Sequence, residues 1–163
     1  AETYHYLLEA MGADLDAEIS GDDIVAVMRK GEENDGCGEE VHLGAMRGLA
    51  MRAEAKTAAR IFEILLDMAM PRVKVTENIE IGLAAMRAAA LNASVKNAEH
   101  IMHLMRDEGI IDLQDLDVGC SEKIRHLRAV GLAVFFEACA RARNKEAAMQ
   151  LLGALEKKNG SLD

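Results

Sequence analysis

The feature that most constrains the fold of this chain is an internal repeat with a period of 40 residues. When residues 41–67 are aligned with residues 81–107, ten of the 27 positions are identical and no gap is needed. Several of the other positions exchange residues of similar size, such as Val41 for Ile81 and Gly44 for Ala84. Repeats of about 20 to 50 residues are typical of solenoids, whose units bury their apolar faces against their neighbours.

A second pattern occurs four times and marks one face of a helix. It consists of a small residue followed by apolar residues three, four and seven positions later, the spacing of residues that share a helix face. The four copies begin at Gly21, Ala58, Ala98 and Ala148. We expect each small residue to let a neighbouring helix approach closely, and the three larger residues to fill the space between helices.

Each copy of this pattern follows a segment rich in small residues, which predicts a first helix for every repeat. These first helices are expected at about residues 2–12, 39–53, 77–91 and 122–142. Composition agrees with helices, because Ala, Leu and Met dominate the apolar residues while aromatic residues make up only 3%.

Breaks between the helices follow from turn chemistry. Residues 31–38 form a polar, glycine-rich stretch that predicts a loop, and Pro71 is expected to stop a helix. Residues 110–121 are an insertion before the fourth repeat, and Leu113, Leu116 and Val118 predict a short ordered turn packed on the helices.

These patterns together predict an all-α fold, a right-handed α-α superhelix of about four helix-turn-helix repeats. We expect one domain over residues 1–163. The repeats are expected at about residues 1–37, 38–75, 76–120 and 121–163.

Three stretches resemble the pentatricopeptide repeat family, and the resemblance extends over nearly the whole chain as a divergent four-repeat member. They are residues 3–10, 105–110 and 132–160. The resemblance implies a protein of mitochondria or chloroplasts that binds single-stranded RNA. It also implies that polar side chains, on each first helix and at the last position of each repeat, read one base per repeat.

The positions that the resemblance assigns to base reading are mostly apolar here. On the first helices they fall at His5, Leu43, Leu83 and Ala133. At the ends of the repeats they fall near Asp35, Val73, Leu113 and Asp163. Of the first-helix residues, only His5 can form a hydrogen bond to a base edge. This departure favours protein partners, with single-stranded RNA as the alternative.

Charge also bears on the partner. The formal net charge is −9, whereas domains that bind nucleic acid usually carry a basic stripe, so no DNA partner is expected. Arg47 and Arg87 occupy equivalent places on successive first helices, where they would contact phosphates or an acidic partner, or be solvated or paired with acidic neighbours. The matching places in the other repeats are Glu9 and Glu137, which interrupt any basic track.

The two adjacent phenylalanines of the last repeat predict a contact surface. Neighbouring residues on a helix diverge by about 100°, so either Phe135 or Phe136 should face the core and the other should face away. An outward ring near the end of a stack suits a contact with a further repeat or with a partner.

No pattern in the sequence predicts catalysis, a cofactor or a bound metal ion. The three cysteines show no CxxC spacing, and His100 and His103 lack a third ligand, so surface histidines are the expected interpretation. No glycine-rich phosphate loop or nucleophile motif occurs, and no run of 18 apolar residues predicts a membrane span. The chain begins with Ala1, which suggests a processed or trimmed form. We therefore expect a non-catalytic scaffold or adaptor, soluble or peripheral, in an organellar complex.

Overall fold

The computed structural model describes residues 2–35, 39–67, 75–115 and 119–160, and these residues fold into helices and connections with no strand. The helices in chain order are α1 (Glu2–Ala13), α2 (Gly21–Asp35), α3 (Glu39–Met51), α4 (Ala55–Asp67), α5 (Val75–Leu91), α6 (Val95–Asp107), α7 (Glu122–Arg141) and α8 (Lys145–Asn159). The all-α prediction is confirmed for the described residues. Each predicted first helix agrees with an observed one, α1, α3, α5 or α7, to within two residues at either end.

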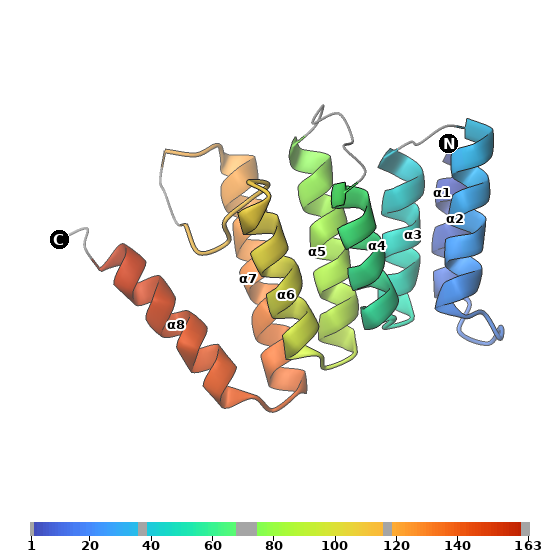
Figure 1. The fold of residues 1–163 in the computed structure, drawn as a ribbon. Coiled ribbons are helices and arrows are strands. Elements are labelled where there is room, and N and C mark those ends of the chain that lie inside the picture. Colours follow the sequence, from blue (N-terminus) through green and yellow to red (C-terminus); the bar gives the residue numbers. More distant parts are fainter. Residues whose placement is uncertain (1, 36–38, 68–74, 116–118, 161–163) are drawn as a thin grey trace.

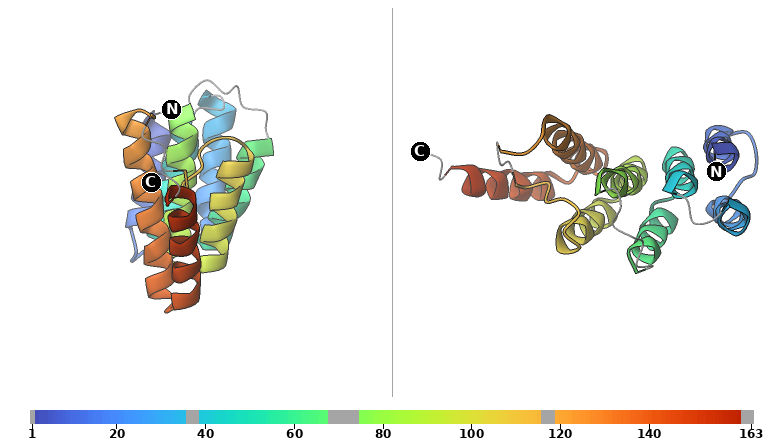
Figure 2. Two further views of the ribbon diagram at one scale, coloured as in Figure 1. Left: turned by 90° about the vertical axis from the view of Figure 1, so that its left-hand side faces the viewer. Right: turned by 90° about the horizontal axis from the view of Figure 1, so that it is seen from above.

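The odd-numbered helices form a row. Helix α1 packs against α3, α3 against α5, and α5 against α7, and all four lie side by side in Figure 1. Seen from above, α2, α4 and α6 lie on one side of this row (Figure 2, right). Each of them contacts the first helices before and after it: α4, for example, packs against both α3 and α5. The repeat in the sequence therefore corresponds to a helix pair that adds one helix to the row.

The turn between the two helices of a pair recurs with the same backbone geometry. Ala53, Ala93 and Arg143 each have a positive φ, of 54°, 53° and 53°. In each turn the N–H of the following residue donates to a carbonyl five residues back, as from Ser94 to Ala89 at 2.8 Å. Such a bond pattern around one left-handed residue ends a helix and reverses the chain. The last three helix pairs thus share one tight turn, whereas α1 and α2 are joined by the longer connection 14–20.

Helices α1 and α3 approach each other through glycines. A Cβ placed on Gly48 would lie 2.5 Å from the carbonyl oxygen of Leu8, and one on Gly12 would lie 2.4 Å from the Cα of Gly48. Both distances are shorter than van der Waals contact, so only glycine fits at this crossing. The two backbones therefore touch at this crossing.

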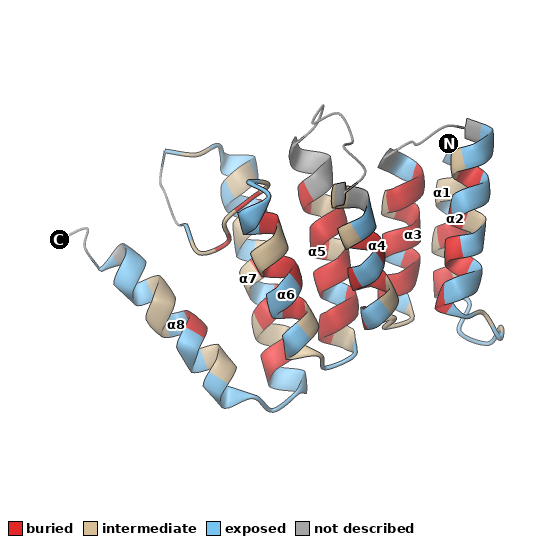
Figure 3. Cartoon of the chain, in the orientation of Figure 1, coloured by how far each residue is buried: buried red, intermediate tan, exposed pale blue. Residues whose placement is uncertain are grey.

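The repeated helix-face pattern fills the core in the first three repeats. In α6, Ala98, Ile101 and Met105 are fully buried and Met102 is nearly so. The described residues of the copies in α2 and α4 are buried in the same way, while the side chain of Leu65 lies outside the described set. Figure 3 shows the buried residues concentrated along the row from α3 to α7.

The fourth copy of the pattern behaves differently, and the expectation that it also fills a core is wrong. Of the four residues of this copy in α8, only Leu151 is buried, while Leu152 is 42% exposed. Helix α8 packs against α7 and leans away from it in Figure 1. No described helix follows α8, and in the other pairs the next first helix packs on that face.

Two connections also refine the predictions. Helix α2 continues through Gly31 to Asp35, so the predicted loop begins later than expected. The longer α2 places the Glu32 carboxylate 2.6 Å from Nε2 of the fully buried His42. In the predicted insertion, Leu113 is fully buried and lies against Gly131 of α7, whereas Leu116 and Val118 lie outside the described residues.

Candidate partner-binding groove

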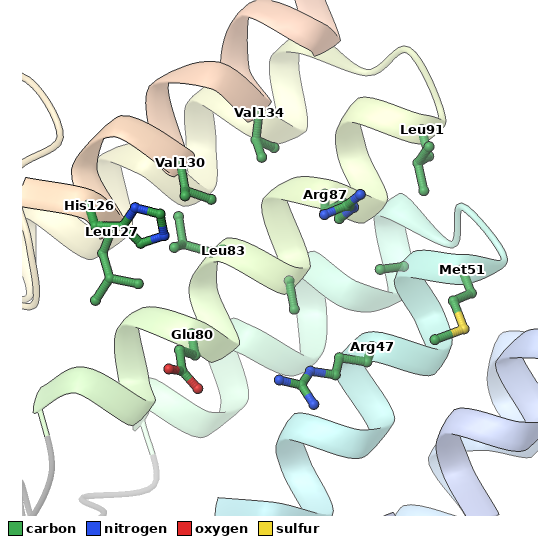
Figure 4. Close-up of a pocket in the computed structure, with 12 residues that line it drawn as sticks. Arg47, Met51, Glu80, Leu83, Arg87, Leu91, His126, Leu127, Val130 and Val134 are labelled. Atoms are coloured by element: carbon green, nitrogen blue, oxygen red, sulfur yellow. The ribbon is translucent and has the colours of Figure 1, made fainter. Parts of the chain in front are cut away.

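A groove of about 590 Å³ crosses the row of first helices, from α3 over α5 to α7 (Figure 4). It lies on the helices to which the sequence assigned the partner-facing residues. A hollow of this volume is within the range of sites that hold a small ligand or a few side chains of a partner.

The floor of the groove is apolar and mostly buried. Leu83, Leu127 and Val134 are each exposed by no more than 8%. Val130 is half-buried beside them, and Met51 stands at the α3 edge with 45% of its surface exposed. Apolar side chains of a partner would therefore be removed from water here, which is favourable by about 25 cal/mol per Å².

Four polar side chains stand around this floor: Arg47, Glu80, Arg87 and His126. Arg47 is 45% exposed on its side chain and donates a hydrogen bond of 3.0 Å to the Glu9 carboxylate of α1. Arg87 is exposed, and among the described residues no carboxylate or other acceptor pairs with its guanidinium. Arg87 is thus the cation of the groove that remains available to an acidic group.

Helical spacing explains why these residues meet. On α5, Glu80, Leu83 and Arg87 are three and four residues apart, so they share one face. On α7, His126 and Val130 are four residues apart in the same way. Because the first helices pack in succession, the faces on α3, α5 and α7 join into one surface.

Two basic residues stand between two acidic ones at equivalent places of this row. Glu9, Arg47, Arg87 and Glu137 follow one another on α1, α3, α5 and α7. Glu9 pairs with Arg47, and Glu137 pairs with Arg141 of its own helix at 2.9 Å. Arg47 is therefore paired with an acidic neighbour, while Arg87 is exposed to solvent.

The structure holds His5, the one polar residue of the predicted base-reading positions on the first helices, in contacts within the chain. Its Nδ1 lies 2.8 Å from the carbonyl oxygen of Glu40, and its Nε2 lies 3.4 Å from the Glu9 carboxylate. Only 15% of the side chain is exposed. His5 therefore links α1 to α3, and it lies outside the groove.

The other predicted partner-facing residues are divided. Leu83 lines the groove together with Arg47 and Arg87. Leu43 is half-buried against the core, and Ala133 is exposed on α7, and neither lines the groove. Of the predicted last-position residues, Leu113 is fully buried. Val73, Asp163 and the side chain of Asp35 lie outside the described residues.

The sequence did not predict that His126, Val130 and Val134 of α7 line the groove. His126, Val130 and Val134 are spaced by four residues, a signal that was present in the sequence but that reads equally well as ordinary core packing. Arg47 and Arg87 were related by the 40-residue register of the repeat. The insertion before α7 breaks this register, so the residues of α7 could not be aligned with them in the same way.

The remaining reactive side chains among the described residues form no second site. Burial, with a smaller effect from the charge of Glu99, raises the pKa of the Cys139 thiol, which keeps it protonated and unreactive at neutral pH. Within the described ranges, no three His, Cys, Asp or Glu side chains gather as they would around a metal ion. His100 pairs with Glu63 of α4. None of the described helices is both long and apolar enough to cross a membrane.

Comparisons with protein-family models, with curated proteins and with solved structures found no match to this chain. The groove and its residues are therefore interpreted from their own chemistry.

Proposed function

We propose that this chain is a non-catalytic helical-repeat adaptor that binds a segment of a protein partner in the groove over α3, α5 and α7. In this proposal the chain is a divergent member of the pentatricopeptide repeat family, with its four helix pairs wound as a right-handed superhelix. Its place would be an organellar complex, as the resemblance implies.

The observation that carries the proposal is the combination of an apolar floor with one unpaired cation. Leu83, Val130 and Val134 offer a surface for apolar side chains, and Arg87 offers charge-assisted hydrogen bonds to a carboxylate. A partner segment that fits carries apolar residues together with Asp or Glu. Because the groove is built on helices, the chain itself should lose little conformational entropy when such a segment binds.

Single-stranded RNA is the second candidate. The observation in its favour is that Arg47 and Arg87 both line the groove, where they would contact phosphates. Against it stand the carboxylate of Glu80 in the same groove, the pairing of Arg47 with Glu9, and the apolar residues at the base-reading positions.

Selection from a random peptide display library on the purified chain tests the proposal. We expect enrichment of peptides that combine apolar residues with Asp or Glu. Their affinity should fall about tenfold or more in Arg87→Glu and in Val130→Asp, since one close charge pair or one buried apolar contact is worth about 1.4 kcal/mol or more. Arg29→Glu is the matched control, because Arg29 is an exposed arginine of α2 outside the groove.

The same variants separate the two candidates. If the chain binds no selected peptide but binds random single-stranded RNA with an affinity that falls steeply with salt, the adaptor proposal is wrong. RNA binding that Arg87→Glu abolishes and Arg29→Glu preserves would then assign the groove to RNA.

A further inference from the structure

At the C-terminal end of the helix row, several side chains are exposed or half-buried although the equivalent side chains one repeat earlier are buried. The shared turn aligns Arg143 with Ala93. Ala133, Phe136 and Ala140 of α7 therefore correspond to Leu83, Met86 and Ala90 of α5. All three α5 residues are buried, and α7 packs on that helix. On α7, Ala133 and Ala140 are exposed and Phe136 is half-buried. Of the two phenylalanines, Phe135 is the one that faces the core, with 2% exposure.

Helix α8 extends this uncovered face. Leu152 is 42% exposed and Met149 is 56% exposed, whereas Met102, the α6 residue equivalent to Leu152, is only 5% exposed. A hollow of about 260 Å³ lies between α7 and α8, lined in part by Phe136 and Ala148. The face formed by these residues of α7 and α8, here called the end face, has the pattern of a surface that another first helix would cover.

We propose that α1 of a second copy of this chain covers the end face, so that copies associate head to tail. Helix α1 stands at the other end of the row, and α2 and α3 are the helices that pack on it. Thr3, Leu7 and Ala10 are four and three residues apart, so they share one side of α1, and all three are exposed. Leu7 is 46% exposed, and its neighbour Tyr6 is 67% exposed.

The two ends carry opposite charge, although the chain as a whole is acidic. Residues 1–28 contain seven Asp and Glu and no Lys or Arg. Residues 141–158 contain five Lys and Arg against two Glu. Complementary potentials of this kind set the orientation of association and speed up encounter. Two copies placed head to tail bring opposite charges together, whereas two like ends would repel.

The charges also lie at the same edge of the row. In Figure 1 the connection between α1 and α2 and the turn between α7 and α8 are both at the lower edge. Asp14, Asp16 and Glu18 of the first are exposed, as are Arg143 and Lys145 of the second. Helix α3 runs beside α1 in the same direction (Figure 1). If α1 of another copy runs beside α7 in the same way, its α1–α2 connection lies next to the turn between α7 and α8.

Contacts of this kind already join successive repeats within the chain. Arg52, in the turn between α3 and α4, donates hydrogen bonds to the carbonyl oxygens of Asp14 at 2.8 Å and Ala17 at 3.1 Å. Asn92, in the next turn, donates to the carbonyl oxygen of Ala53 at 2.8 Å. In the proposed assembly, the turn that contains Arg143 lies against the α1–α2 connection of the docked copy. Because the two surfaces differ, the contact does not close on itself and further copies can add to either end.

Sedimentation velocity of the full 163-residue chain tests this, first over micromolar to millimolar concentrations at low salt. We expect a series of oligomers that grows with concentration and shrinks as salt screens the charges. Two variants then each block one surface: Leu152→Asp blocks the end face, and Leu7→Asp blocks α1. Each variant alone should be monomeric, and an equimolar mixture should form dimers and nothing larger, because one intact surface of each kind remains.

Ile64→Asp is the matched control, since Ile64 of α4 is 41% exposed and lies on neither surface. It should keep the oligomer series, and circular dichroism should show the same helix content for all three variants. Arg143→Glu combined with Lys145→Glu should weaken association about tenfold or more.

Three results would overturn the proposal. The first is a wild-type chain that stays monomeric at every concentration, which would leave the end face to a helix of a different protein. The second is dimerisation of Leu7→Asp by itself, which would show that two end faces pair with each other. The third is an equimolar mixture that stays monomeric while the wild-type chain associates, which would place the contact elsewhere.

Discussion

The side-chain amide of Asn92 donates a hydrogen bond of 2.8 Å to the carbonyl oxygen of Ala53, which stands 39 residues earlier in the chain. Ala53 is the left-handed residue of its turn, and Asn92 precedes Ala93, the left-handed residue of the next turn. The bond therefore connects equivalent turns of successive helix pairs. The Ala53 carbonyl oxygen also accepts a hydrogen bond of 2.9 Å from the Ala55 N–H, so the Asn92 amide supplies a second donor to the same oxygen.

Arg52 makes the corresponding connection one repeat earlier, and we expect Arg52→Ala to lower the free energy of unfolding by about 2 kcal/mol. Its guanidinium donates to carbonyl oxygens of Asp14 and Ala17, and hydrogen bonds to a charged group contribute about 1.5 to 3 kcal/mol. Urea unfolding monitored by circular dichroism measures the change. Arg29→Ala, at an exposed place on α2, should change stability by less than about 0.5 kcal/mol.

Replacing Ala93 by glycine should stabilise the protein. Its φ of 53° places the Cβ close to the following carbonyl, a conformation that glycine adopts without this penalty. We expect Ala93→Gly to raise the free energy of unfolding by about 0.5 to 1 kcal/mol. The same change at Ala129, an exposed residue inside α7, should lower it by a similar amount. Equal losses at both sites would contradict the left-handed turn.

Gly48→Ala should be strongly destabilising, because the added methyl group meets backbone and no flexible side chain. A Cβ there would lie 2.5 Å from the carbonyl oxygen of Leu8, so α1 and α3 must separate. We expect a loss of about 2 to 3 kcal/mol. Gly153→Ala is the matched control, since a Cβ at this position of α8 meets nothing within 4 Å. The substitution also replaces a glycine in the interior of a helix. Thermal unfolding should show Gly153→Ala stabilised by about 0.5 to 1 kcal/mol.

Asp112 should make the free energy of unfolding depend on pH in the acidic range. Burial raises the pKa of its carboxyl, but hydrogen bonds from Lys158 and the Gln114 N–H, with the charges of Lys158 and Arg106, outweigh burial and hold it below the usual value. The folded pKa is thus lower than the unfolded one. The carboxylate therefore stabilises the fold above the unfolded value of about 4, and this contribution is lost as pH falls through the folded pKa.

Stability measured by urea unfolding between neutral pH and about pH 3 should therefore fall more steeply for the wild-type chain than for Asp112→Asn. Because the Lys158 and Asp112 side chains are 48% and 27% exposed, the difference at neutral pH should stay below about 1 kcal/mol and shrink with salt. Lys158→Gln should reduce the slope in the same direction. An unchanged slope in both variants would contradict the ion pair between α8 and the segment after α6.

The helices, and the part of the groove on α3 and α5, could be predicted because they follow from sequence patterns within a helix or one repeat. The spacing of Ala98, Ile101 and Met105 depends only on helix geometry, and the structure confirms that all three are buried on one helix. The repeat register linked Arg47 to Arg87 and placed them on one surface. It gave no information on His126 and Val130, because the insertion after α6 breaks the register and their spacing also suits a core helix.

The pairing of side chains could not be predicted in the same way. Arg47 and Arg87 are equivalent in sequence, yet a carboxylate of α1 reaches only the first of them. Likewise, His5 was a candidate for base recognition, and the structure shows both ring nitrogens facing acceptors on α1 and α3. Such contacts depend on distances across the stack, which a residue's own neighbours in sequence do not determine.

The sequence by itself determined that this protein is built of helix pairs, because helix periodicity and turn chemistry act over a few residues. Only the tertiary structure decided which copies of the repeated face are covered. The four copies share one spacing, but Met102 is buried and Leu152 is 42% exposed. The physical reason is that burial of a face depends on the helix packed against it, and that helix belongs to the next repeat.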